Sequence, residues 1–305
     1  MLFGALYRAK LLEGLVHPTY GNTMYHTGII RIITESGFMP LYDLSYGGLT
    51  KSFYVPAYRL FTASLSALSG TDPVVTAGLM VIALGVVSVA AIYLLGKEFG
   101  GPWAGVCCAA LFVLSPELTI YTIRPFPEVL GVPMLLLALY FVRKGDTRFA
   151  VLASVLTALT HQTSAVVLGS ILLVHAVVAK DKRSASALMA MFLAYFVWQL
   201  HALGSLDIAN MRQIALKESG AITMMHIERI GLFALLAAPF GAIRALKNKY
   251  WLLVAITAAT FLLSKNELLG IGIFTDRLFT FFALAVVILG GIGLAEIGRA
   301  WGKAK

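Results

Sequence analysis

Long apolar segments dominate the sequence after Asp72, and they restrict the chain to a membrane fold. Only 13% of the 305 residues are charged, whereas soluble domains carry about 25%. Backbone polar groups in lipid must be satisfied within their own segment, and the alternation of a β-barrel strand is absent. We therefore expect an all-α, multi-pass transmembrane helix bundle over residues 73–305. The apolar runs predict about nine spans: 74–96, 102–119, 127–142, 148–161, 164–179, 184–203, 229–246, 250–264 and 277–297.

Basic residues gather in the short loops of one face. If the spans alternate, the loops 143–148, 180–183 and 244–249 and the tail 299–305 all fall on the same side. The positive-inside rule predicts that this face is cytoplasmic. We therefore expect a protein of the cell membrane whose C-terminus lies in the cytoplasm. The same rule and anionic head groups account for the net charge of +9, so we expect membrane lipid and no nucleic acid as partner.

A polar stretch over residues 17–72 belongs to the opposite, outer face. We interpret residues 1–72 as a large outer first loop with interfacial helices, since residues 1–16 are too short and too charged to span convincingly. A membrane-entering span is accordingly expected upstream. Residues 24–34 predict a helix that stops near Gly37, and residues 53–68 predict an amphipathic helix in the interface.

Three side chains in this stretch are suited to chemistry. Asn22 and His26 share a helix face because they are four residues apart, and His26 can bind a phosphate or help to hold a metal. Asp43 can act as a base or a metal ligand. The alternatives are a solvated polar face for His26 and a turn-forming residue for Asp43.

A second group of candidates comes from later outer loops. Glu128 opens a span, where the helix dipole alone would favour a carboxylate, but a carboxylate at the membrane boundary is costly unless it is used. Arg124 can hold a phosphate or pyrophosphate. His161 ends a span at the same level, either as a site residue or as a hydrogen-bonded packing residue. Arg277 either forms a local ion pair with Asp276 or holds a lipid phosphate.

The order of these elements resembles the GT-C class of membrane glycosyltransferases, which includes oligosaccharyltransferase catalytic subunits and protein mannosyltransferases. The first outer loop of that class commonly reads Asp-x-x-Tyr-His, Ile-x-x-Ile-x-Glu-x-Gly-x-x-Pro, an acidic residue, a Tyr-Pro-Pro-like element and Leu-Ser-x-x-Ser/Thr-Gly. The similar stretches here are 22–26, 30–40, Asp43, 54–58 and 65–70. The segment 124–128 resembles the second acidic site, and 160–163 and 276–277 also fit the class.

The resemblance implies a sugar donor linked to a polyprenyl phosphate and an acceptor on the outer face. Asp43 and Glu128 match the acidic sites, where a carboxylate acts as base or holds a divalent metal such as Mg²⁺ or Mn²⁺ on the donor phosphates. With Asn22 they form the expected catalytic set. The expected donor phosphate-binding set is His26, Arg124, His161 and Arg277.

One departure leaves a competing hypothesis open. The class usually has Asp where this chain has Asn22, and an amide cannot accept a proton. Either Asp43 carries the base function, or the protein is a non-catalytic polyprenyl-phosphate binding or transport protein on the same scaffold. Generic secondary transport fits less well, because charges lie at the outer boundary and no internal repeat is present.

Overall fold

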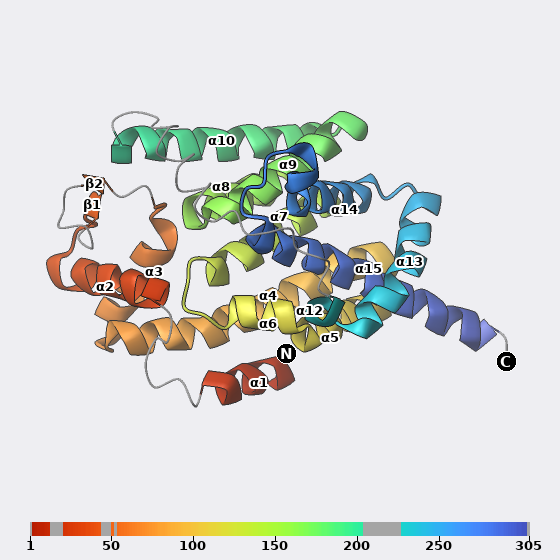
Figure 1. The fold of residues 1–305 in the computed structure, drawn as a ribbon, viewed down its shortest axis with the longest axis horizontal. Coiled ribbons are helices and arrows are strands. Elements are labelled where there is room, and N and C mark those ends of the chain that lie inside the picture. The colour runs from red at the N-terminus through yellow and green to blue at the C-terminus, as the bar shows by residue number, and fades with distance from the viewer. Residues whose placement is uncertain (1, 13–20, 44–49, 52–53, 204–226, 304–305) are drawn as a thin grey trace.

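The structure, a computed structural model, describes residues 2–12, 21–43, 50–51, 54–203 and 227–303 (Figure 1). That part of the chain is almost entirely helical. The first helices are α1 (Leu2–Leu12), α2 (Gly21–Ser36), α3 (Ala57–Ser69), α4 (Pro73–Gly100), α5 (Pro102–Leu114), α6 (Pro116–Thr122) and α7 (Glu128–Lys144). The later ones are α8 (Thr147–Thr160), α9 (Gln162–Val178), α10 (Lys182–Leu203), α12 (Ile227–Ile230), α13 (Leu232–Lys247), α14 (Trp251–Ser264), a 3₁₀ turn (Asn266–Leu269) and α15 (Thr275–Lys303).

Every apolar run predicted as a span contains a helix, so the expected helix bundle is confirmed. Among the described helices, α4, α10 and α15 are long and apolar enough to cross a membrane. The pair α5 and α6 also qualifies if it is one span bent by 71°. The helices α8, α9 and α14 are apolar but shorter. The molecule is an integral membrane helix bundle, and the count of nine spans stays a prediction.

Helix α15 runs through the middle of the bundle (Figure 1). It packs against α13, α5, α14, α4 and α6, and most of its apolar stretch is buried by protein. Its buried side chains, from Leu278 to Ile292, form the centre of the main apolar core. The position of α15 matters for the site because its first turn carries Asp276 and Arg277.

Helices α2 and α3 of the first loop lie together at one end of the bundle, whereas α1 packs against α4 (Figure 1). Helix α2 covers the predicted stretch 24–34 and ends before Gly37, whose φ of +77° suits the absence of a side chain. Helix α3 buries Tyr58 and Arg59 and exposes Leu60, Phe61 and Leu68, and its expected place at a membrane interface stays a prediction. Between the two helices, β1 (Tyr42–Asp43) pairs antiparallel with β2 (Thr50–Lys51).

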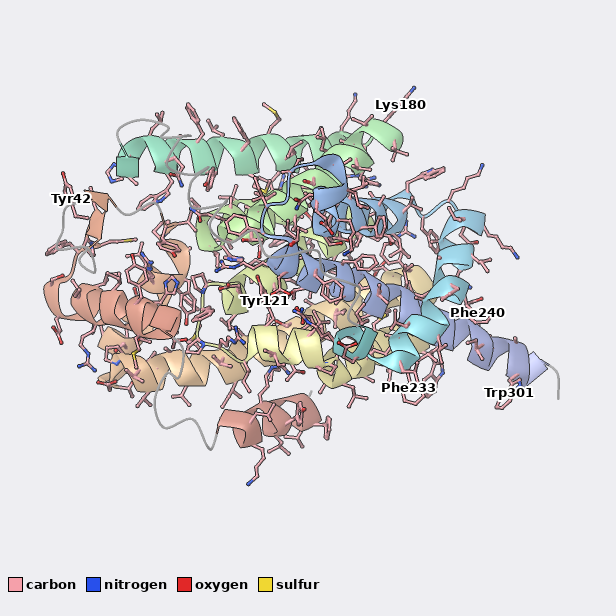
Figure 2. All side chains as sticks on the ribbon, viewed as in Figure 1. Tyr42, Tyr121, Lys180, Phe233, Phe240 and Trp301 are labelled. Atoms are coloured by element: carbon pink, nitrogen blue, oxygen red, sulfur yellow. The ribbon has the colours of Figure 1, made fainter. Side chains whose placement is uncertain are left out.

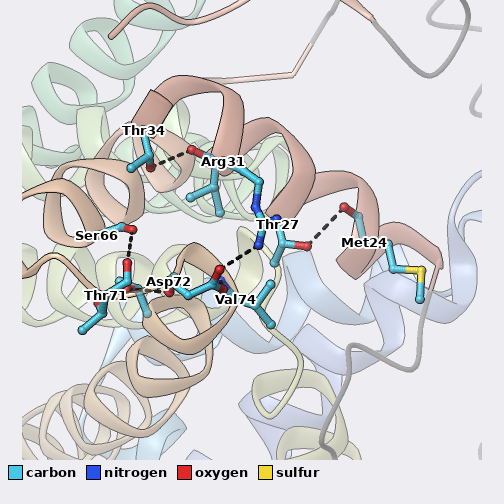
Figure 3. A network of polar contacts seen from close by, with 10 residues as sticks. Met24, Thr27, Arg31, Thr34, Ser66, Thr71, Asp72 and Val74 are labelled. Atoms are coloured by element: carbon cyan, nitrogen blue, oxygen red, sulfur yellow. Dashed lines mark hydrogen bonds and ion pairs between the residues drawn. The ribbon is translucent and has the colours of Figure 1, made fainter. Parts of the chain in front are cut away.

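Polar contacts join these helices to the start of α4 (Figure 3). The Arg31 guanidinium of α2 donates to a carboxylate oxygen of Asp72 over 2.7 Å. The other oxygen of Asp72 accepts from the backbone amide of Val74 and so caps α4. Ser66 of α3 donates to the carbonyl oxygen of Thr71. The first loop is thereby fixed to the long helix that supports it.

The loops predicted to be basic lie toward the other end of the bundle, where Lys180 and Trp301 are labelled (Figure 2). Arg143 lies over the ring of Tyr250, and Arg299 donates to the carbonyl oxygen of Gly100. These basic loops lie away from the candidate site residues whose side chains the structure describes. Which end faces the cytoplasm stays a prediction.

Candidate active site

Side chains from several separated parts of the chain meet around one cavity of about 380 Å³. The polar ones include His26 of α2, Glu128 of α7, His161 between α8 and α9, and Arg277 of α15. Most of the remaining wall is apolar or aromatic: Tyr54, Val55, Phe126, Val166, Leu263, Ile271, Ile273, Phe274 and Leu278. We name this space the apolar cavity. Its lining combines mostly apolar side chains with a few polar groups in fixed positions, as is common for ligand-binding sites.

Glu128 is the first residue of α7 and is only 7% exposed. Pro127 precedes it and cannot donate a backbone N–H, so the chain readily begins a helix here. The free amides and dipole of the first turn favour the negative charge of the carboxylate. A carboxylate this buried needs a further partner, because loss of water destabilises its charged form.

His161 supplies that partner, with its Nε2 atom 3.5 Å from Oε1 of Glu128. The backbone amide of Ser164 donates to His161 Nδ1 over 3.3 Å, and this contact caps α9. Because Nδ1 accepts that hydrogen bond, the ring proton of the neutral imidazole lies on Nε2 and faces Glu128. The break between α8 and α9 therefore fixes both the place and the tautomer of the ring.

Arg59 holds His26 from the opposite side. Its Nε donates to His26 Nδ1 over 3.2 Å, and its guanidinium lies over the rings of Tyr25 and Tyr54. Arg59 is 1% exposed and His26 is also buried. Burial, and then the charge of Arg59, lower the pKa of His26 well below its ordinary value. His26 is accordingly neutral at pH 7, with its proton on Nε2 because Nδ1 accepts from Arg59.

A second cavity, of about 420 Å³, adjoins the apolar cavity and also has Glu128 in its lining. Phe126, Glu128 and Arg277 line both cavities. The second is more polar, and its other lining residues are Glu117, Ile120, Tyr121, Arg124, Arg229, Asp276 and Thr280. We name it the polar cavity. Glu128 thus stands in a wall between an apolar and a polar space.

Arg229 of α12 organises the polar cavity. Its Nε donates to Glu117 over 2.7 Å, and its NH1 donates to Asp276 over 2.6 Å. Thr280 also donates to the buried carboxylate of Glu117. A local pair between Asp276 and Arg277 was one expectation, but the ion pair observed at Asp276 runs to Arg229 instead.

The structure brings most predicted site residues together. His26, Glu128, His161 and Arg277 line the apolar cavity, and Arg124 lines the polar one. The side chains of Asn22 and Asp43 lie outside the described residues, although the backbone places Asn22 on α2 and Asp43 on β1. Among the side chains that are described, no three of His, Cys, Asp or Glu gather closely enough to hold a metal.

Sequence reasoning missed Arg59 and Arg229 as parts of the site, and it identified Glu117 only as one of many candidate residues on the outer face. Arg59 lies 33 residues from His26, so no short-range spacing links them. Glu117 and Arg229 are separated by 112 residues. The pattern of spans places Glu117 on the outer face, but it places many other residues there as well and does not single out Glu117.

Comparison with known proteins finds similarity in structure alone. No protein family and no curated protein matches the sequence. One similar solved structure is ArnT from Cupriavidus metallidurans bound to undecaprenyl phosphate, with 17% identity and a TM-score of 0.70, covering 99% of this chain and 61% of ArnT. Another is the Archaeoglobus fulgidus oligosaccharyltransferase AglB with an inhibitory peptide and a dolichol-phosphate. Its identity is 13% and its TM-score 0.64, over 100% of this chain and 51% of AglB.

The Archaeoglobus oligosaccharyltransferase in complex with Zn and sulfate is similar to the same degree, with 13% identity and a TM-score of 0.67. The match covers 98% of this chain and 49% of that oligosaccharyltransferase. The chain therefore spans about half to three-fifths of these structures, and at such identities the likeness concerns the fold. The chain is an integral membrane helix bundle with a GT-C-like glycosyltransferase fold.

Proposed function

We propose that the protein transfers a sugar from a polyprenyl-phosphate-linked donor to an acceptor on the outer face of the cell membrane, with the C-terminus in the cytoplasm. One observation carries the proposal: the buried Glu128 carboxylate lies in the wall shared by the apolar and polar cavities. Similar folds occur in ArnT bound to undecaprenyl phosphate and in AglB with a dolichol-phosphate. A lipid-linked donor on one side and a hydrophilic acceptor on the other would meet at this wall.

The lining of the two cavities suggests where the donor lies. The aromatic and aliphatic wall of the apolar cavity suits the first prenyl units, because burying apolar surface is favourable. Arg277 lines both cavities and can bind the donor phosphate with two parallel N–H groups. His26 and His161 add neutral imidazoles at the same cavity, and Arg124 adds a guanidinium at the polar one.

The reaction moves one bond and one proton. The bond between the sugar C1 and the phosphate oxygen breaks, and the polyprenyl phosphate leaves with the electron pair. A new bond forms between C1 and the acceptor atom, whose proton passes to a carboxylate. We assign that carboxylate to Glu128, and Asp43 is the other acidic site of the proposal.

His161 Nε2–H helps to keep Glu128 in place, because the two face one another at 3.5 Å. A divalent cation such as Mg²⁺ or Mn²⁺, if held by Asp43 and a Glu128 oxygen, would neutralise the donor phosphate. Hard divalent cations prefer several oxygen ligands, and Glu128 with His161 alone supplies too few of them.

The test uses the full chain in lipid nanodiscs with a radiolabelled polyprenyl-phosphate sugar. We expect release or transfer of the sugar that depends on divalent metal and is lost in both Glu128→Gln and Asp43→Ala. Unchanged turnover in both variants would contradict the assignment. Donor binding is measured separately, by retention of the labelled lipid, so that a loss of binding is not taken for a loss of chemistry.

Asn22 favours the second candidate, a non-catalytic protein that binds or transports the same lipid. Its amide stands where the GT-C class that the sequence resembles usually has Asp, and an amide cannot act as a base. This candidate predicts lipid retention without turnover under every metal tested. If an Asn22→Asp variant gains turnover, then the wild-type protein is inactive because it lacks a carboxylate at position 22.

A further inference from the structure

A groove between α13 and α15 lies at the basic end of the bundle, away from both cavities of the site (Figure 1). The two helices touch backbone to backbone where they cross. A Cβ atom at Gly241 would overlap the carbonyl oxygen of Leu289, and one at Gly293 would overlap that of Ala237. Small residues allow this close approach, as in other membrane helix pairs.

Beyond the crossing, the residues between the helices become large and a space of about 560 Å³ remains. Phe240, Ile243, Ile297 and Trp301 form its apolar part, and Phe240 and Trp301 are labelled in Figure 2. Trp301 is 80% exposed, and Phe240 and Ile243 are about half exposed. In a membrane bundle such exposed apolar side chains face lipid, and Trp favours the level of the head groups.

The polar part of the groove is cationic. Arg244 and Lys247 line it, and the single lining carboxylate, Glu296, is already shared by Arg244 and Arg299. Within the described part of the chain, Lys247 makes no hydrogen bond or ion pair. The Nε of Arg244 is buried without an acceptor. A buried donor that lacks an acceptor is unfavourable, so this group calls for a negatively charged or polar ligand.

We infer that this groove binds the phosphate head group of an anionic phospholipid. The phosphate oxygens accept from Arg244 and Lys247, while the acyl chains lie along Phe240, Ile243 and Trp301. A free phosphate would match the two cations but leave the apolar wall uncovered. A phospholipid satisfies both parts at once, and basic pockets between membrane helices are suited to such head groups. The inference does not depend on the proposed transfer reaction.

The experiment measures which lipid stays with the full chain after purification. The protein is reconstituted into vesicles of phosphatidylcholine with a minority of phosphatidylglycerol, extracted in mild detergent and analysed by native mass spectrometry. We expect retained phosphatidylglycerol in the wild type. In Lys247→Gln and in Arg244→Gln, retention falls by about fivefold for each charge removed.

Lys182→Gln is the matched control, because Lys182 is an exposed lysine at the start of α10 at the same end of the bundle. It should retain the lipid as the wild type does. Equal losses in all three variants would mean a general surface charge effect and would overturn the site. Equal retention of phosphatidylglycerol and phosphatidylcholine would also contradict the inference and would favour a partner protein as occupant. Displacement of the retained phosphatidylglycerol by inorganic phosphate would contradict it as well.

Arg244→Gln risks misfolding, since Arg244 holds Glu296. Lys247 is exposed and has no such structural contact in the described part of the chain, so Lys247→Gln decides the matter alone. A folded Lys247→Gln protein that retains the wild-type amount of phosphatidylglycerol refutes the proposal.

Discussion

Arg59 and Arg143 make the same kind of contact at opposite ends of the bundle, in very different surroundings. Each guanidinium lies between 4.7 and 5.1 Å from the centroids of two aromatic rings. The rings belong to Tyr25 and Tyr54 at the site end, and to Phe99 and Tyr250 at the basic end. Arg59 is 1% exposed, whereas Arg143 is exposed.

The contrast in exposure between Arg59 and Arg143 extends to the other charged groups at the two ends of the bundle. At the site end, charged and titratable groups are removed from water and depend on protein partners: Arg59 on His26, Glu128 on His161, and Glu117 on Arg229. At the basic end, cations stay near water and lipid head groups, where pairing contributes little. Removing one partner of such a contact should therefore lower stability or activity much more at the site end than at the basic end.

The largest expected effect is on turnover. Glu128→Gln keeps the size of the side chain but removes the carboxylate to which we assign proton acceptance, so under the proposed function transfer should fall by about 10²- to 10⁴-fold. The measurement is single-turnover sugar transfer at saturating donor. Glu98→Gln removes a carboxylate from the end of α4 at the basic end and should leave transfer unchanged. Equal effects of the two changes would mean that the ends do not differ in function.

The second effect concerns stability. Arg229→Gln leaves Glu117 as a buried carboxylate with its main cation removed, so the free energy of unfolding should fall by about 3 to 5 kcal/mol. Adding Glu117→Gln should restore part of the loss, because the uncompensated charge is then gone. Thermal melting in one detergent measures both. A double variant that is less stable than Arg229→Gln by the full cost of Glu117→Gln would mean that the two residues are independent.

The sequence predicts the bundle well because each span carries its own signal. Apolar runs predict the helices, and Gly37 and Pro127 mark where α2 stops and α7 starts. The site is predicted only as a set of residues on one face. The partnerships of Arg59 with His26, and of Arg229 with Glu117, join residues 33 and 112 positions apart. Such pairs depend on how the helices pack, which no local pattern encodes.

The third effect separates the two stacked arginines directly. Lysine keeps the charge but loses the planar fork that lies over the rings and donates to His26. Arg59→Lys should therefore cost about 2 kcal/mol, whereas Arg143→Lys should cost about 0.5 to 1 kcal/mol at most. Melting temperatures of the two variants, measured side by side, give the ratio. If Arg143→Lys is the more damaging change, burial is not what distinguishes these contacts.

The smallest effect is a pH dependence that His26 contributes at the site end. The pKa of His26 in the folded protein lies below 6.5, its ordinary value, because of burial and then of Arg59, with smaller effects of His161 and Arg277. The unfolded chain therefore takes up a proton as the pH falls below about 6.5, while the folded chain resists it. Stability is complete above that pH and declines below it, by at most about 1.4 kcal/mol per pH unit from this residue.

Comparing wild type with His26→Asn isolates this contribution. The difference in melting temperature between pH 7.5 and pH 5.5, on the order of a few degrees, should be smaller in the variant. A matched change at His201, which is exposed near the end of α10, should leave the wild-type slope intact. If His26→Asn has the same slope as the wild type, then His26 is protonated as readily in the folded chain as in the unfolded one. In that case Arg59 would not be holding a neutral ring, and the distinction between a water-excluded end and a solvated end would not extend to His26.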